Sequence, residues 1–268
     1  MVKAWIISIG NELLIGRIVN TNASWLAKKL VFLGFNVERI IVVPDNKNDI
    51  IEELKRSLSR AEVTITTGGL GPTYDDMTTE AVASALDRKL VLDKKALELV
   101  QKFYNNKNME LTPERIKMAY VPEGAIILEN PVGAAPAYIV EINRKIVAVL
   151  PGVPGEMKAI FETFVEKHLK SKYTTHVHVV EYYVIIKGVP ESSLAPVINR
   201  LSKEHKDVYL KSHPKGHETT NPVLDIRVFV SSDKSMVEAE EKARYIISEI
   251  VANARKLGGT IVESGRTV

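Results

Sequence analysis

Three short apolar runs occur near the start of the chain. They span residues 3–9, 37–43 and 63–67, and they are rich in isoleucine, valine and threonine. Runs of this length with few polar positions are typical of strands that are buried on both faces of a parallel sheet. We therefore expect three neighbouring strands in one sheet.

Segments with apolar residues at helical spacing separate these runs. The first is a predicted helix that Asn22 can cap and Gly34 ends, with one apolar stripe formed by Leu26, Leu30 and Leu33. The second is a predicted helix capped by Asn48, with its inward positions at Ile51, Leu54 and Leu58. The resulting order of strand, helix, strand, helix and strand predicts a doubly wound α/β sheet.

The order of elements changes after residue 170. The pattern there predicts, in turn, a strand, a helix, two strands and a helix at residues 176–187, 191–205, 208–212, 223–230 and 235–254. This order suits a small α+β layer with two helices on one face of an antiparallel sheet. We therefore expect one domain at residues 1–170, a second at 171–256 and a C-terminal tail at 257–268.

The composition excludes several classes of protein. The 268 residues, of which 45% are apolar and 26% charged, are enough for a full hydrophobic core. The chain has no cysteine, which excludes disulfides, thiolate-bound metals and a cysteine nucleophile. No apolar run approaches the roughly 20 residues of a membrane span, and the N-terminus does not look like a signal peptide. The net charge of +3 gives no general indication of a nucleic-acid partner. We expect a cytoplasmic protein that binds neither membrane nor nucleic acid.

A glycine-rich loop, TTGGLGPTYDDM, follows the third predicted strand. It lies where open α/β sheets bind ligands, at the carboxyl end of a parallel strand. Gly68, Gly69 and Gly71 allow a sharp turn and bring backbone N–H groups close to an anion such as phosphate. The spacing matches neither the P-loop nor the dinucleotide-binding fingerprint.

Two adjacent carboxylates, Asp75 and Asp76, end this loop and would repel phosphate. A divalent cation resolves the conflict, because carboxylate and phosphate oxygens can share a magnesium-like ion. The alternative is that Asp75 is a solvated turn residue, and that Asp76 or Thr78 caps the next helix.

Two further carboxylates follow the other predicted strands. Glu12 lies just after the first strand, in a loop that also carries Asn20 and Asn22, and Asp45 lies just after the second. Glu12, Asp45 and Asp76 should converge from three neighbouring strands, which is stronger support for a site than any one of them. Taken alone, Asp45 could be an ordinary turn residue beside Pro44.

Two later loops could bind a second anion. One is ENPVGAAPAY, which contains Gly133, and the other is LPGVPGEM, which contains Gly152 and Pro154 before a predicted helix. A helix N-terminus at the second loop could hold a phosphate or a carboxylate. Turn geometry explains the glycines and prolines of both loops equally well.

Other candidate motifs favour structural roles. The histidine pairs in HPKGH and HVH lack further ligands at a known metal-site spacing. The chain has no GxSxG elbow of a serine hydrolase.

Five motifs together resemble a known family. In chain order they are GNELLIGRIVNTNASWLAKKL, VVPDNKNDI, TTGGLGPTYDDMT, VPEGAIILENPVGAAPAY and VLPGVPGEM. In this order and spacing they resemble the N-terminal domain of the CinA family (competence/damage-inducible protein CinA), within the MoaB/MogA molybdopterin-binding superfamily. The resemblance covers about residues 1–170 and implies a three-layer, mostly parallel α/β fold.

The resemblance also implies two candidate activities. In the superfamily the GGxGP loop holds a phosphate or nucleotide, the aspartate at the position of Asp76 serves an adenylyl-transfer site, and Asp45 matches an acidic position of that site. CinA-type domains are associated with divalent-metal-dependent hydrolysis of ADP-ribose or FAD-like pyrophosphates. A phosphate cradle with metal-binding carboxylates is compatible with either chemistry.

The second predicted domain resembles the KH-like middle domain of CinA proteins. It has no GXXG loop between its helices, so we expect a structural or dimerising domain rather than an RNA-binding one. Many CinA proteins continue into a domain that deamidates nicotinamide mononucleotide. We do not carry that activity over, because only about a hundred residues follow the first domain.

The leading hypothesis is a metal-dependent nucleotide pyrophosphatase that works as a homodimer on a nucleotide-like small molecule. Asp76, Asp45 and Glu12 would be the catalytic and metal-binding residues, with cobalt, magnesium or manganese as the cation and potassium as an additional candidate. The positions expected to contact phosphate or nucleotide are Gly68, Gly69, Gly71, Thr73, Asn20, Asn22, Gly133, Gly152 and Pro154. The alternative is a molybdopterin-binding or adenylyl-transfer protein of molybdenum cofactor synthesis.

Overall fold

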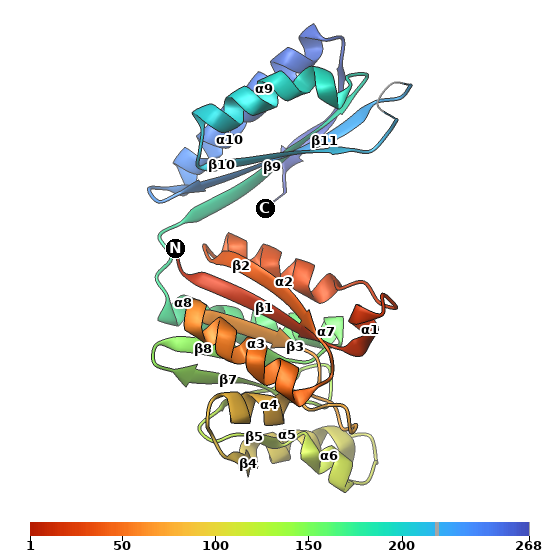
Figure 1. Ribbon diagram of the computed structural model, residues 1–268, viewed down its shortest axis with the longest axis vertical. Coiled ribbons are helices and arrows are strands. Elements are labelled where there is room, and N and C mark those ends of the chain that lie inside the picture. The colour runs from red at the N-terminus through yellow and green to blue at the C-terminus, as the bar shows by residue number, and fades with distance from the viewer. Residues whose placement is uncertain (218–219, 268) are drawn as a thin grey trace. The chain divides into compact units, whose positions relative to one another are not determined.

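A computed structural model of the protein describes residues 1–217 and 220–267. The chain forms two compact units (Figure 1). The first comprises Met1–Val31 and Phe35–Thr175, and the second comprises Phe32–Gly34 and His176–Val268. In the described part of the chain, no helix combines the length and the apolarity needed to cross a membrane.

The first unit is built on a six-stranded, mostly parallel sheet, which confirms the predicted fold class. The strands, in spatial order, are β2 (Asn36–Val43), β1 (Lys3–Ile9), β3 (Val63–Thr67), β8 (Lys145–Leu150), β7 (Ala137–Ile142) and β6 (Ile126–Leu128). The first four are parallel, whereas β7 and β6 run antiparallel to their neighbours. The ends of the four parallel strands therefore meet at one edge of the sheet.

Helices cover both faces of this sheet. After β1 come α1 (Asn11–Leu14) and α2 (Thr21–Phe32), and α3 (Lys47–Arg60) follows β2. Right-handed crossovers in the order β2, β1, β3 require α2 and α3 to lie on opposite faces. One hydrophobic cluster joins β1 to α3, α4 (Thr78–Ala85) and α5 (Lys94–Asn105) through buried residues that include Ile7, Ile50, Val82 and Val100.

The remaining elements of this unit are short or lie toward its end. They are β4 (Leu90–Leu92), α6 (Pro113–Lys117), β5 (Tyr120–Pro122) and α7 (Pro154–Ile160). A π-helical turn at Phe161–Val165 joins α7 to α8 (Glu166–Lys172). Trp25 of α2 packs edge to face on Phe161, with the ring centroids 5.4 Å apart.

Two predicted helix caps were wrong by two residues. Asn46, and not Asn48, caps α3, because its Oδ1 accepts from the backbone N–H groups of Asn48 and Asp49. At α2 the Asn20 Oδ1 accepts from the N–H of Ala23, at 3.1 Å, whereas Asn22 is buried in the first turn. In both loops two asparagines stand two residues apart, and the one that precedes the helix has the geometry to cap it.

The second unit is a four-stranded antiparallel sheet with two helices. The strands, in spatial order, are β10 (Val208–Pro214), β11 (Val223–Ser232), β9 (His178–Lys187) and β12 (Thr260–Arg266). The helices α9 (Glu191–Glu204) and α10 (Met236–Lys256) share one hydrophobic cluster with this sheet. Ser235 caps α10, since its Oγ accepts from the N–H of Glu238. The predicted order of strand, helix, two strands and helix is therefore confirmed.

The segment 257–268, expected to be a tail, contains strand β12 instead. Gly258 adopts a φ of +82° after α10, and this left-handed turn reverses the chain so that β12 pairs with β9. The sequence TIVESGR alternates too weakly to reveal a strand by itself, and its pairing partner lies more than 70 residues earlier.

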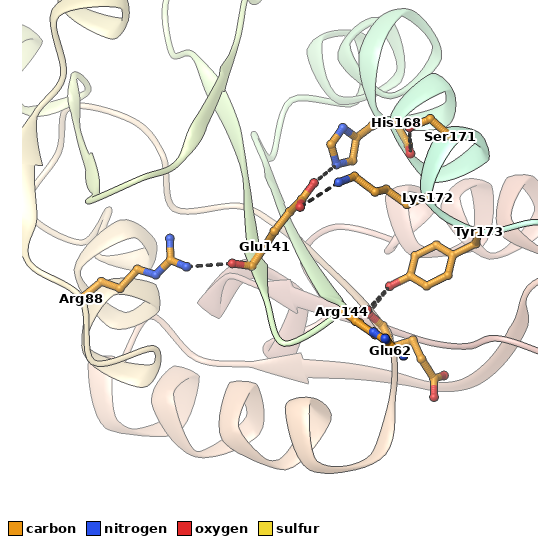
Figure 2. A network of polar contacts seen from close by, with 8 residues as sticks. All are labelled: Glu62, Arg88, Glu141, Arg144, His168, Ser171, Lys172 and Tyr173. Carbon is orange, nitrogen blue, oxygen red and sulfur yellow. Dashed lines mark hydrogen bonds and ion pairs between the residues drawn. The ribbon is translucent and has the colours of Figure 1, made fainter.

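A network of polar contacts fastens α8 to the hairpin of β7 and β8 (Figure 2). On β7, Glu141 Oε1 lies 2.8 Å from His168 Nε2, and Glu141 Oε2 lies 2.9 Å from Lys172 Nζ. The hydrogen bond from Lys172 lowers the pKa of the Glu141 carboxyl.

Tyr173 closes the same network just after α8. Its hydroxyl oxygen lies 2.8 Å from the backbone carbonyl of Arg144 and 3.1 Å from that of Glu62, so its one hydrogen can be donated to either. Burial raises the pKa of Tyr173 to about 12, so the hydroxyl keeps its proton and remains a donor at any physiological pH.

Replacing Glu141 with glutamine should make the free energy of unfolding less dependent on pH in the acidic range. The Glu141 pKa is lower in the folded protein than its ordinary value of 4.5, so its contribution is present above that pH and is lost as the pH falls through the folded pKa. Since the side chain is 37% exposed, solvent screening limits the effect to less than about 1 kcal/mol. Urea unfolding between pH 7 and pH 3 measures it. Glu98→Gln, at an exposed pair, is the control, and equal pH dependence in the two variants would contradict the assignment.

Candidate functional site

A cavity of about 430 Å³ lies at the carboxyl ends of the parallel strands. The loops that follow β1, β2, β3 and β8 all contribute to its wall. Eight of the residues predicted from the sequence line it together: Glu12, Asp45, Gly68, Gly69, Gly71, Thr73, Asp76 and Gly152. The three carboxylates of Glu12, Asp45 and Asp76 therefore line one cavity.

Three predicted residues, Asn20, Asn22 and Pro154, line a smaller cavity of about 110 Å³ instead. This cavity adjoins the larger one, because both are lined by Glu12 and Gly152.

Asn22 does not have the role that we predicted. Both hydrogen atoms of its side-chain amide are in use, since Nδ2 donates to Thr67 Oγ1 at 3.0 Å and to the Gly152 carbonyl at 2.8 Å. An amide in this state has no donor left for a phosphate oxygen. Asn22 therefore holds α2 to the loops after β3 and β8.

Gly133 is not part of the main cavity either. It lines a separate hollow of about 210 Å³, and its N–H donates to Asn130 Oδ1 at 2.8 Å. An occupied N–H cannot bind phosphate, so the predicted phosphate contact at Gly133 is wrong in this structure.

The glycine loop adopts a backbone that requires glycine. Gly68 has a φ of +111° and Gly69 a φ of +69°. A Cβ on Gly68 would lie 2.2 Å from the carbonyl oxygen of Ile9, and one on Gly69 would lie 2.2 Å from Thr78 Oγ1. The loop therefore packs directly on the end of β1 and on the start of α4.

Neither Asp76 nor Thr78 caps α4, in contrast to our prediction. The Thr78 hydroxyl donates to the Gly68 carbonyl at 2.8 Å, and the N-cap position is Met77, which makes no side-chain capping bond. Thr78 thus satisfies the Gly68 carbonyl, and Asp76 accepts hydrogen bonds from Thr73 of the same loop.

Asp76 is held by Thr73. Its Oδ2 accepts from the Thr73 N–H at 2.8 Å and from the Thr73 hydroxyl at 2.5 Å. The same hydroxyl also contacts Asp75 and lowers the pKa of that carboxyl. Because a hydroxyl has one hydrogen, Thr73 can donate it to only one of the two aspartates at a time.

Glu156 is a carboxylate of the cavity that sequence reasoning missed. It lies in the first turn of α7, and its Oε2 accepts from Asn130 Nδ2 at 2.7 Å. The segment LPGVPGEM could have indicated this residue, because its glutamate follows two glycines at the end of a parallel strand.

Glycines make room for three of these carboxylates. A Cβ on Gly10 would lie 2.4 Å from Glu12 Oε1, and one on Gly71 would lie 2.5 Å from Asp76 Oδ2. A Cβ on Gly133 would lie 2.4 Å from Glu156 Oε1. The smallest side chain is thus needed at these positions so that a carboxylate can fold against the backbone.

The cavity is strongly acidic. Five carboxylates line it, from Glu12, Asp45, Asp75, Asp76 and Glu156, and its described lining contains no lysine or arginine. Lys117 donates to the Thr73 carbonyl and lines an adjoining cavity of about 280 Å³. The larger cavity is therefore an environment that favours positive charge.

The carboxylates suit a cation that arrives with its ligand. Across residues 1–217 and 220–267, no three His, Asp or Glu side chains are grouped closely enough to hold a metal by themselves. Magnesium-like ions are commonly bound by one or two carboxylates together with substrate phosphates, rather than by a complete protein cage. The donor set therefore fits a divalent cation in chemical type, with phosphate oxygens as the remaining ligands.

Replacing Gly68 with alanine should destabilise the fold by about 2 to 4 kcal/mol, because the variant combines a positive φ with a clash against Ile9. Chemical unfolding followed by circular dichroism measures the change. Gly155→Ala is the matched control, since a Cβ there meets nothing within 4 Å and Gly155 lies in helix α7. Equal stability of the two variants would contradict the close packing of the loop.

Comparison with known proteins agrees with this architecture. Residues 5–171 match the model of the family described as probable molybdopterin binding domain. A protein of Aeropyrum pernix is 50% identical over 97% of each chain, and a protein of Pyrobaculum aerophilum is 50% identical over 92% of this chain and 90% of its own. The crystal structure of the protein CinA with unknown function from Thermoplasma acidophilum is 39% identical, with a TM-score of 0.59, and the match covers 62% of this chain and 96% of that one. The chain therefore belongs to the molybdopterin-binding domain family, as a CinA-like member.

Proposed function

We propose that this protein hydrolyses the phosphoanhydride bond of a nucleotide-like pyrophosphate, such as ADP-ribose or an FAD-like dinucleotide, with the help of a divalent cation. The observation that carries the proposal is the acidic cavity, in which five carboxylates face a glycine loop and no basic side chain is among the described lining residues. The glycine loop supports a phosphate-containing ligand, because loops of this kind at the ends of parallel strands let backbone N–H groups approach phosphate closely.

The glycine loop supports phosphate binding through its backbone. Within the described residues, the N–H groups of Gly69 and Gly71 donate no hydrogen bond, and both residues line the cavity. Such N–H groups are suitable donors to phosphate oxygens. Gly68 is less suitable, since its N–H donates to the Leu150 carbonyl at 3.0 Å.

The carboxylates divide into two kinds. Asp45 accepts from the N–H of Asn11 at 2.8 Å, and Asp76 accepts from Thr73, so both are held in place with an oxygen left for a cation. The Glu12 carboxylate makes no hydrogen bond within the described residues, which leaves it free to accept a proton from the attacking water.

The cation would be cobalt, magnesium or manganese, held by Asp76 and Asp45 with Glu12 nearby. When bound, it supplies positive charge to the phosphate oxygens and makes water more acidic. We further propose that the protein acts in the cytoplasm as a homodimer, and potassium belongs in the same set of cations to be tested.

A second candidate function is binding of molybdopterin, with adenylyl transfer from ATP. The match of residues 5–171 to a molybdopterin-binding family favours it, and the same glycine loop and Asp76 would serve it. This function differs from the first in its product, because adenylyl transfer attaches AMP to the ligand rather than releasing it.

Asp76→Asn should abolish metal-dependent release of AMP from ADP-ribose. The expected loss is about 100-fold or more, because the variant removes a carboxylate that is held in the cavity by two hydrogen bonds. The measurement is chromatography of AMP with cobalt, magnesium, manganese and no added metal, each with and without potassium. Asp87→Asn is the matched control, since Asp87 is exposed and outside the cavity.

The two candidate functions give different outcomes in this experiment. AMP release by the wild type that Asp76→Asn removes supports the pyrophosphatase. No release with any cation, together with binding of molybdopterin and transfer of labelled AMP from ATP, rejects hydrolysis and supports the second function.

A further inference from the structure

A short segment beside the acidic cavity exposes an unusual amount of apolar surface. Four of its six residues are large aliphatics with high exposure, namely Leu14 at 51%, Ile15 at 73%, Ile18 at 55% and Val19 at 80%. Contiguous exposed apolar groups of this size mark interaction sites more often than isolated ones do. We call residues 14–19 the apolar rim.

The apolar rim is an ordered structure rather than a loose loop. The N–H of Ile15 donates to the Asn11 carbonyl at 3.0 Å, and the N–H of Arg17 donates to the Glu12 carbonyl at 3.0 Å. Gly16, with a φ of +70°, makes the turn between them. The backbone therefore fixes these side chains toward solvent, where they are unfavourable unless another surface covers them.

The rim is continuous with the candidate site. Glu12, which lines the acidic cavity, immediately precedes it, and Ile18 and Val19 line the smaller cavity that shares Glu12 and Gly152. Val153, which lines the acidic cavity, is also largely exposed. Any surface that covers the rim therefore reaches the entrance of the site.

The charges of the rim and the cavity are complementary. Arg17 lies in the middle of the rim and is exposed, and within the described residues its guanidinium makes no hydrogen bond or ion pair. The acidic cavity beside it has five carboxylates, and Arg17 of the same chain does not line it. Arg17, which makes no ion pair within the described residues, thus lies in a segment that adjoins carboxylates with no basic side chain among the described lining residues of their cavity.

We propose that a second copy of this chain covers the apolar rim, and that Arg17 of the partner subunit reaches the acidic cavity. A two-fold contact places the same surface on both sides, so each copy can offer its arginine to the other's carboxylates. A stable dimer buries about 800 Å² on each partner, with an apolar centre and a polar border. The four aliphatic side chains supply such a centre, and Arg17 with the cavity entrance supplies the border.

This arrangement completes a site that a single chain leaves without a basic group. An arginine at the cavity entrance would bind phosphate oxygens with its planar pair of donors. The proposed dimer depends only on the observations about the apolar rim. The contact between Arg17 and phosphate depends on the proposed function as well.

The first test is the oligomeric state. We expect the wild type to be a dimer in sedimentation velocity and light scattering, and Ile15→Asp and Val19→Asp to be monomers with unchanged circular dichroism. Met109→Asp, an exposed apolar position outside the rim, is the control and should remain a dimer. A monomeric wild type, or a dimer that survives both rim substitutions, overturns the proposal.

The second test asks whether Arg17 acts across the interface. Arg17→Ala and Asp76→Asn each disable every site of their own homodimers. When equal amounts of the two variants are unfolded and refolded together, about half of the dimers should contain one chain of each kind. Such a dimer has one intact site of two, formed by Asp76 of one chain and Arg17 of the other. The mixture should therefore recover about one quarter of wild-type activity. Recovery of no activity means that Arg17 does not act in trans and overturns that part.

A wild type that dimerises but has no pyrophosphatase activity rejects the proposed function alone. Binding of inorganic pyrophosphate with magnesium, measured by calorimetry on the same mixtures, then replaces activity as the readout. Full-affinity sites in about one quarter of the chains would support Arg17 in trans, and their absence would exclude it.

Discussion

The close approach of backbone at Gly68 positions the rest of the site. Gly68, just after β3, has no room for a Cβ, because the carbonyl oxygen of Ile9 at the end of β1 lies where it would be. A Cβ on Gly152, after β8, would in turn lie 3.3 Å from the Cα of Gly68. Asn22 joins the same place by bonding to Thr67 and to the Gly152 carbonyl. Three loops are thereby brought within contact distance, and their carboxylates have one cavity to share. Any side chain at Gly68 would push these loops apart before it affected any ligand.

The carboxylates of the cavity are held by neutral donors. Asp45 is bonded by a backbone N–H, Asp76 by Thr73, and Glu156 by Asn130. Neutral donors fix the direction of a carboxylate without cancelling its field, unlike a lysine or arginine. The surface pairs elsewhere in the chain, such as Glu141 with Lys172, are built in the opposite way. The cavity is therefore organised to attract positive charge, whether this comes from a metal ion or from another protein chain.

The sequence was sufficient to predict the strands, most helices and the edge of the sheet where the loops gather. These features depend on local periodicity and on the rule that parallel strands end at a common edge. The roles of single residues were harder to predict. A glycine that admits a phosphate and a glycine that admits a carboxylate look the same in the sequence, so the sequence does not distinguish a phosphate contact at Gly133 from the room that Gly133 makes for Glu156. Strand β12 was missed because its pairing with β9 depends on contacts that are distant in the chain.

Strand β12 also affects the order in which the second unit can form during synthesis. It closes one side of β9, whose other side pairs with β11, so β9 is a central strand only when β12 is in place. Between these two strands the ribosome must produce α9, β10, β11 and α10. Throughout that interval one edge of β9 has unpaired N–H and C=O groups, the kind of edge to which strands of other chains can add. The second unit of a nascent chain is therefore most exposed to aggregation or to chaperone binding until Thr260–Arg266 emerges.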